Sequence, residues 1–237
     1  MKKDKVTDLV FVLDRSGSMA GLEKEVINGF NKIIEERREN EGKVKVTTVL
    51  FDNEVECIHK RVKIKEINDM TEKEYYPRGT TALLDAIGIT ISYMSGVEEK
   101  LKEKGKKHKV LFIIQTDGLE NASKKYDYYS IRKLIREKRE NDKWNFLFLG
   151  ANIDSISEAE NLGISKSCAC DFVANEEGLD VTYNALSDAV AGFCDLSSID
   201  FSEAFGDEWK KSIEEFNELE DIVTKQMEES DFEETLE

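Results

Sequence analysis

Short apolar runs alternate with amphipathic stretches along most of the chain. Three runs are apolar at consecutive positions, which is typical of strands that helices cover on both faces, and they are Leu9–Leu13, Val110–Ile114 and Phe146–Leu149. Apolar residues three or four positions apart predict helices over residues 21–39, 82–103, 127–140, 154–162 and 178–193. Strands and helices therefore alternate.

Two further runs, Val44–Phe51 and Val55–Val62, are rich in β-formers and are separated by only three residues, so they predict a hairpin. Residues 168–173 predict one more short strand. This succession indicates a three-layer α/β fold with a mainly parallel sheet and one antiparallel strand at an edge. In such sheets ligands bind outside the carboxyl ends of the strands, where the strand order switches.

The residues after 194 differ from the rest in charge. The chain carries a net charge of −16, and sixteen of its 50 acidic residues but only three of its 34 basic residues lie in 195–237. Residues 1–194 are nearly neutral, so neither part offers the basic face that nucleic acid or an anionic membrane requires. We therefore divide the chain into a domain over 1–194 and an acidic tail over 195–237.

The tail carries an apolar stripe with helical spacing. Its members are Phe205, Trp209, Ile213, Phe216, Leu219, Ile222, Val223 and Met227. This stripe predicts an amphipathic helix that either docks on its own domain or binds a partner, including a second copy of the chain. The last ten residues, 228–237, are acidic and almost without apolar groups, so we expect them to be disordered.

Cysteine content and the absence of long apolar runs point to a cytoplasmic protein. The four cysteines are too few and too scattered for a disulfide framework in a chain of 237 residues. The longest apolar runs have five residues, which is too short to span a bilayer, and no apolar stretch follows the basic start Met1–Lys5 as it would in a signal peptide.

Three oxygen-rich segments lie where predicted strands or loops meet helices. They are Asp14–Ser18, Gly79–Thr81 and Thr116–Gly118. Each alone is compatible with an ordinary turn or helix cap. Together they offer carboxylates and hydroxyls without His or Cys, which is the ligand chemistry of Mg²⁺ or Mn²⁺.

These segments resemble the von Willebrand factor A domain family and its metal-ion-dependent adhesion site. The resemblance rests on Asp14–Met19, Gly79–Ile87 and Ile113–Gly118 and covers roughly residues 6–194, while Leu149–Asp154 is similar to A domains of bacterial and phage-borne cytoplasmic proteins. It implies a doubly wound, Rossmann-like sheet of order 3-2-1-4-5-6.

The resemblance also implies a set of metal ligands for Mg²⁺ or Mn²⁺. These ligands are Asp14, Ser16, Ser18, Thr81 and Asp117. Thr81 is chosen over Thr80 because the family places the ligand Thr five residues before a small helix residue, here Ala86, and the choice could be off by one.

Two carboxylates and three hydroxyls leave one octahedral position open, and a cation with little compensating charge favours an anionic sixth ligand. We therefore expect a protein-binding module whose partner supplies an Asp or Glu. Rim candidates that either contact the partner or merely pack the loops are Arg15, Tyr75, Tyr76, Arg78, Leu119, Glu120, Asn121, Asn152 and Asp154, the last also a candidate helix N-cap.

The alternative is a metal-dependent hydrolase of phosphoesters or peptides that uses the same site. Such enzymes usually position a general base. Neither His59, on the predicted hairpin, nor His108, ahead of a strand, is placed for that role, and no glycine-rich nucleotide motif is present. We therefore favour binding over catalysis.

Overall fold

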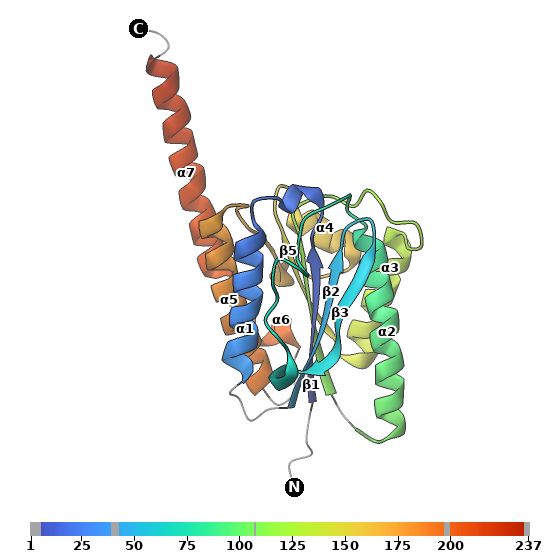
Figure 1. Ribbon diagram of the computed structural model, residues 1–237. Helices are drawn as coiled ribbons and strands as arrows, with labels where there is room; N and C mark the ends of the chain where they lie inside the picture. Colours follow the sequence, from blue (N-terminus) through green and yellow to red (C-terminus); the bar gives the residue numbers. More distant parts are fainter. Residues whose placement is uncertain (1–5, 39–42, 107, 197–199, 235–237) are drawn as a thin grey trace.

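The computed structural model describes residues 6–38, 43–106, 108–196 and 200–234, with side chains as far as Met227. Its centre is a six-stranded sheet of order β3-β2-β1-β4-β5-β6 (Figure 1). The strands are β1 (Val6–Asp14), β2 (Lys43–Phe51), β3 (Val55–Lys63), β4 (His108–Thr116), β5 (Asn145–Gly150) and β6 (Ala169–Asp171). Only β3 is antiparallel to its neighbour, which confirms the predicted order and the antiparallel edge.

Helices cover both faces of the sheet and give three layers (Figure 1). On one side α1 (Glu23–Arg38) packs against α5 (Glu176–Asp195), and on the other α3 (Tyr128–Glu137) contacts both α2 (Leu83–Glu103) and α4 (Ser155–Leu162). Short helical turns connect the elements: η1 (Gly17–Met19), η2 (Ile64–Glu66), the π-turn η3 (Lys138–Asp142) and η4 (Lys166–Cys168). Among the described residues, no helix is both long and apolar enough to cross a bilayer.

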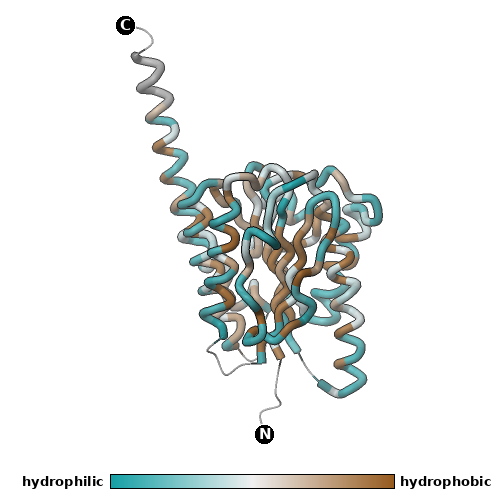
Figure 2. The backbone as a smooth tube through the Cα atoms, in the orientation of Figure 1, coloured by the Kyte–Doolittle hydropathy of each residue, from teal (hydrophilic) through white to brown (hydrophobic). Residues whose placement is uncertain are grey.

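The core lies on both faces of the central strands. Residues Leu9–Leu13 of β1 are at most 1% exposed, because helices cover each face, and the same explains the apolar runs of β4 and β5 (Figure 2). Phe11 contacts Phe30 of α1 edge to face, with ring centroids 5.1 Å apart. Gly29 allows α1 to approach α5 closely, because a Cβ there would lie 2.1 Å from the ring of Tyr183.

Packing against the core continues past residue 194, the boundary expected from the change in charge along the sequence. Helix α6 (Phe201–Phe205), the turn η5 (Glu208–Lys210) and the start of α7 (Lys211–Glu234) lie against α5 and β6. Phe201, Trp209 and Ile213 are at most 6% exposed. The first half of the tail therefore docks on its own domain, as one of the two alternatives held.

Side chains from this docked segment bind carbonyl groups along the β6 edge of the sheet. The indole of Trp209 donates to the carbonyl of Ser167 at 2.8 Å, and the ammonium of Lys210 donates to the carbonyl of Ala169 at 3.1 Å. The amide of Asn217 donates to the carbonyl of Asp171 at 2.8 Å. The segment 201–217 thus covers an edge whose own strand is only three residues long.

Beyond Asn217, α7 leaves the body. Leu219, Ile222, Val223 and Met227 are 49–63% exposed. Helix α7 extends past the end of the sheet at which β1 finishes (Figure 1). The backbone of 228–234 is helical, and residues 235–237 of the segment 228–237, for which disorder is expected from the sequence, lie outside the described part of the chain.

Candidate metal centre

The site begins where β1 and β4 end side by side. Their parallel pairing, with Leu13 opposite Gln115, brings Asp14 next to Thr116. The Thr116 hydroxyl donates to one carboxylate oxygen of Asp14 at 2.6 Å, and the backbone N–H of Ser16 donates to the other at 2.6 Å. Asp14 is 1% exposed and is therefore held rigidly.

The three oxygen-rich segments converge at this point. Ser18 donates its hydroxyl to Asp117 at 2.6 Å, and the hydroxyls of Ser16 and Ser18 are 3.1 Å apart. A Cβ built on Gly118 would lie 3.8 Å from both the Ser18 and the Thr81 hydroxyl oxygens, so loops one and two meet beside loop three. The structure thus brings together the five residues proposed as ligands.

Thr80 and Thr81 have different surroundings. Thr81 is 3% exposed, whereas Thr80 is exposed. The backbone N–H of Thr81 donates to the side-chain oxygen of Asn121 at 2.9 Å, and the N–H of Asn121 donates to the carbonyl of Thr81 at 3.0 Å. This reciprocal pair fixes Thr81 against the third loop, and its hydroxyl lies on the side of Ser18.

The carboxylates of this cluster are desolvated and accept hydrogen bonds from neutral donors. Burial raises the pKa of Asp14 to about 6 and also raises the pKa of Asp117. A divalent cation would offset this charge. Within the described residues no group of three or more His, Cys, Asp or Glu side chains could hold a metal, so the site is a mixed carboxylate–hydroxyl set that suits a hard cation.

Arg15 is buried rather than part of an exposed rim, which corrects the prediction. It is fully buried because its guanidinium pairs with Asp52 at 2.9 Å and Glu56 at 2.7 Å and donates to the carbonyl of Glu74 at 3.1 Å. These partners come from β3, the turn before it and the loop that follows. Arg15 therefore fastens the first metal loop to the β2–β3 hairpin.

Tyr75 is also buried, so its predicted place on the rim is wrong. Its ring is fully covered, and its hydroxyl donates to the backbone carbonyl of Asp14 at 2.5 Å. Its neighbour Tyr76 is 42% exposed, and the guanidinium groups of Arg15 and Arg78 each lie 5.3 Å from its ring centroid. Arg78 itself is part-exposed and pairs with Asp52 at 2.8 Å.

Glu120 and Asn121 position the loops. The Glu120 carboxylate accepts from the backbone N–H groups of Leu84, Ala122 and Ser123 at 2.7–2.9 Å, and from the Ser123 hydroxyl at 2.7 Å. Its oxygens are thus engaged within the protein, which leaves it tying the third loop to the start of α2. Asn121 holds Thr81 as described above.

The remaining rim candidates divide into two kinds. Leu119 is 58% exposed beside Asp117, and Asn152 is exposed with a left-handed backbone, φ 57°. Asp154 is the N-cap of α4, since its carboxylate accepts from the backbone N–H of Ser157 at 2.9 Å. Tyr76, Arg78, Leu119 and Asn152 are therefore the candidates whose side chains are exposed, Arg78 only in part, while it is paired with Asp52.

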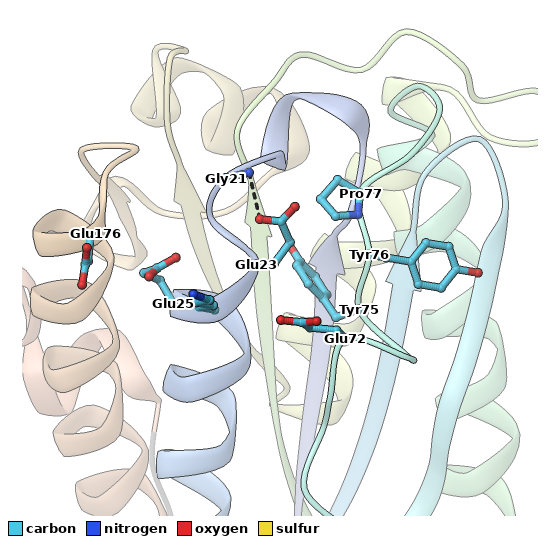
Figure 3. Close-up of a pocket in the computed structure, with 9 residues that line it drawn as sticks. Gly21, Glu23, Glu25, Glu72, Tyr75, Tyr76, Pro77 and Glu176 are labelled. Carbon is cyan, nitrogen blue, oxygen red and sulfur yellow. Dashed lines mark hydrogen bonds between the residues drawn. The ribbon is translucent and has the colours of Figure 1, made fainter.

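A groove borders the first loop (Figure 3). It has a volume of about 720 Å³ and lies between the start of α1, the loop around Tyr75 and Tyr76, and the start of α5. The carboxylates that line it are those of Glu23, Glu25, Glu72 and Glu176. Their negative charge favours the approach of a dication to this end of the molecule.

One residue that shapes the site was not singled out from the sequence. Asp52 is a fully buried carboxylate that accepts hydrogen bonds from both Arg15 and Arg78, which lower its pKa. Thr116 belongs to the third oxygen-rich segment, and its hydroxyl binds Asp14. Asp52 could have been recognised from the sequence because it directly follows β2, and the carboxyl end of β2 lies at the same edge of the sheet as Asp14.

Comparison with known proteins identifies the class first. Residues 8–184 match the family described as von Willebrand factor type A domain, and the chain therefore belongs to that family. No curated protein matches the sequence. Among solved structures, proximal thread matrix protein 1 from the mussel byssus is similar with its metal-ion-dependent adhesion site occupied by zinc (14% identity, TM-score 0.55, 78% of this chain and 46% of that one).

A second crystal form of the mussel protein matches with a TM-score of 0.54 at 14% identity, again over 78% of this chain and 46% of that one. The von Willebrand domain of the type V pili tip protein Mfa5 from Porphyromonas gingivalis has a TM-score of 0.55 at 11% identity, over 81% of this chain and 97% of that one. This chain spans less than half of the mussel protein. At such identities the similarity establishes the fold alone.

Proposed function

We propose that this protein is a Mg²⁺- or Mn²⁺-dependent protein-binding module that takes an Asp or Glu side chain of its partner. The observation that carries the proposal is the convergence of Asp14, Ser16, Ser18, Thr81 and Asp117 from three loops onto one cluster, in which Ser18 is exposed and the other four residues are buried. A bound dication would supply an electrophilic open position for the carboxylate.

The chain's own residues would bind the cation and hold the three loops in place around it. Asp14 and Asp117 would be the charged ligands, and the three hydroxyls neutral ones, so that two negative charges face the dication. Arg15, Tyr75 and Glu120 hold the loops in place without metal. The exposed side chains of Tyr76 and Leu119 would contact the partner around its acidic residue.

Two features support binding over hydrolysis. His108 lies at the amino end of β4 and Asp117 follows its carboxyl end, so the length of the strand, about 26 Å from His108 to Thr116 at 3.3 Å per residue, separates them. His59 bonds to Thr48 on the hairpin, 3.1 Å away. We expect no metal-dependent turnover of phosphoesters or peptides, and turnover lost in both Asp14→Ala and Asp117→Ala would favour the hydrolase.

We also propose a reducing compartment, the cytoplasm, and a family relation to bacterial or phage-borne members. The support is that all four cysteines are free thiols, together with the run Leu149–Asp154 noted in the sequence.

The experiment is affinity capture from a lysate with Mg²⁺ or with EDTA, read by mass spectrometry. The wild-type protein and Asp154→Ala, which changes only a helix cap, should retain a partner in Mg²⁺ and release it in EDTA. Asp14→Ala should retain none. Capture that is identical for Asp14→Ala, or unchanged in EDTA, would contradict the proposal.

A further inference from the structure

The turn between β2 and β3 lies against two of the oxygen-rich segments, the first metal loop (Asp14–Ser18) and the second metal loop (Gly79–Thr81). The first residue of the turn, Asp52, is fully buried. One oxygen of its carboxylate accepts hydrogen bonds from the Nε of Arg15 at 2.9 Å and from the Nε of Arg78 at 2.8 Å. A single side chain therefore binds an arginine of the first metal loop and the arginine that comes just before the second.

The backbone of Asp52 holds the other end of the second metal loop. Its carbonyl accepts a hydrogen bond from the N–H of Ala82 at 2.8 Å. Arg78 precedes this loop and Ala82 follows it, so Thr81 lies in a short segment that Asp52 binds at both ends. The position of Thr81 relative to the sheet therefore depends on one residue that is not itself a proposed ligand.

The two metal loops are also joined to each other and to the turn. The N–H of Arg78 donates to the carbonyl of Arg15 at 2.8 Å, and the N–H of Gly17 donates to the carbonyl of Gly79 at 3.2 Å. Gly79 packs closely on the turn, because a Cβ there would lie 2.1 Å from the side-chain oxygen of Asn53. The loops and the turn are thus held together as one unit.

The charge of Asp52 stabilises this unit more than the neighbouring carboxylates can. Glu56 also pairs with Arg15, and Glu54 with Arg78, but their side chains are 54% and 69% exposed, and water weakens such pairs. Arg15 is fully buried, so without Asp52 its guanidinium would keep only a half-exposed counter-charge, which is strongly disfavoured. The first metal loop would then shift to bring the guanidinium nearer to water.

We propose that Asp52 is a positioning residue of the metal centre, which fixes the hydroxyls of the first and second metal loops relative to each other before a cation binds. The inference rests on the proposed function, since it concerns the same cation. Ser16 and Ser18 lie on the first loop and Thr81 on the second, so the three neutral ligands keep their spacing only while the two loops keep theirs. Ligands that are placed in advance bind more tightly, because less ordering accompanies binding.

Asp52→Asn tests the role of the charge, because the amide keeps the shape of the carboxylate and its hydrogen bonds to arginine are weaker. We expect Mn²⁺ affinity, measured by isothermal titration calorimetry, to fall about tenfold. We also expect the backbone amides of Gly17 and Arg78 to exchange with deuterium about tenfold faster in EDTA, because the loops separate more readily. The second measurement involves no metal and reports on the loops alone.

Asp8→Asn is the matched control at the other end of the sheet. Asp8 is a 1% exposed carboxylate of β1 that binds Arg61 of β3 at 2.8 Å, and it lies about 20 Å from Asp14 along the strand at 3.3 Å per residue. Its substitution should also lower the free energy of unfolding, which urea unfolding measures for both variants. It should leave the Mn²⁺ affinity and the exchange of the two loop amides unchanged.

Arg78→Gln tests whether Asp52 acts through the second metal loop. This variant loses the guanidinium but keeps the backbone hydrogen bond to Arg15. We expect it to weaken Mn²⁺ binding, and the double variant Asp52→Asn/Arg78→Gln to bind no more weakly than Asp52→Asn alone, because both substitutions break the same pair. Mn²⁺ affinity unchanged in Arg78→Gln, or losses that multiply in the double variant, would contradict the proposed coupling of the loops.

The remaining outcomes separate this inference from the proposed function. Wild-type Mn²⁺ affinity or wild-type loop exchange in Asp52→Asn would overturn the inference and leave the proposed function intact. An equal loss of affinity in Asp8→Asn would do the same, since it would indicate a general effect of lower stability. A wild-type protein that binds no Mn²⁺ would overturn the proposed function and the inference together.

Discussion

Thr80 and Thr81 are adjacent in sequence, but Thr81 is buried with its hydroxyl beside Gly118 of the third metal loop, whereas Thr80 is exposed. We expect Thr81→Val, which keeps the shape and removes the hydroxyl, to lower Mn²⁺ affinity tenfold or more, about 1.4 kcal/mol. Thr80→Val is the matched control and should bind as the wild type does. Isothermal titration calorimetry gives both affinities. A larger loss for Thr80→Val would make Thr80 the ligand instead. Equal losses of affinity would contradict the choice of Thr81.

At the scale of single residues, the sequence indicates the residues with oxygen ligands better than it indicates the residues that hold the metal loops in place. The three oxygen-rich segments could be found because hydroxyls and carboxylates recur at strand ends, and the resemblance to the family then implied Asp14, Ser18 and Asp117 within them. Arg15 and Tyr75 were placed on the rim because Arg and Tyr are common at interfaces. Their burial depends on Asp52, Glu56 and the backbone of Asp14 and Glu74, which lie far apart along the chain and meet only in the fold.

Among the elements, the contact between α1 and α5 is tight enough to be tested with a single methyl group. Gly29→Ala would place its Cβ 2.1 Å from the Tyr183 ring, and Tyr183 is anchored by a hydrogen bond of 2.6 Å to Gln115. We expect it to destabilise the protein by about 1–3 kcal/mol. Urea unfolding measures this difference.

Gly96→Ala in α2 is the control for that substitution. No neighbouring segment or side chain comes within 4 Å of the place that the added methyl group would take, so alanine gains helix propensity without a clash. We expect it to stabilise the protein by about 0.5–1 kcal/mol. If Gly29→Ala also raised the free energy of unfolding, α1 and α5 would have adjusted to the added methyl group.

Strands buried on both faces were the easiest elements to predict, since a short run of consecutive apolar residues such as Val110–Ile114 is compatible with few structures other than a buried strand. The docked half of the tail was harder. Trp209, Ile213 and Leu219 belong to one helical stripe in the sequence, yet the first two are covered and the third is 61% exposed. Periodicity marks an apolar face, but the size of the body decides how much of that face is covered.

For the whole molecule, His108 makes stability depend on pH. Its imidazole lies between Asp8 of β1, at 2.6 Å, and Glu98 of α2, with Arg61 on Asp8 and Lys102 near Glu98. Although burial opposes the charged form, the two carboxylates raise its pKa from 6.5 to about 9. The stabilisation is therefore complete below pH 6.5 and is lost as the pH rises through 9.

We expect the free energy of unfolding to fall by up to about 3 kcal/mol across that interval. His108→Gln should show no such decline, because glutamine does not titrate. Urea unfolding between pH 6 and pH 9.5 compares the two proteins. A wild-type stability that rises over this range would contradict the assigned charge of His108.

Removal of the metal should affect stability only modestly, because the six strands and their helices form a full core without it. Saturation at a hundredfold excess over the dissociation constant adds about 2.7 kcal/mol, and EDTA should remove no more than this. Thermal unfolding followed by circular dichroism provides the measurement. Unfolding of the protein by EDTA at room temperature would make the metal structural rather than a binding site for partners.

The segment 201–217, which covers the β6 edge, protects the protein against aggregation through that edge. Trp209, Lys210 and Asn217 occupy carbonyl groups that a foreign strand would otherwise pair with. A chain cut after residue 194 would keep all six strands and every proposed metal ligand, yet it would uncover that edge together with the apolar surface beneath Phe201 and Ile213. Shortened versions ending there would add strand to strand between molecules, whereas versions ending after Asn217 would keep the edge closed.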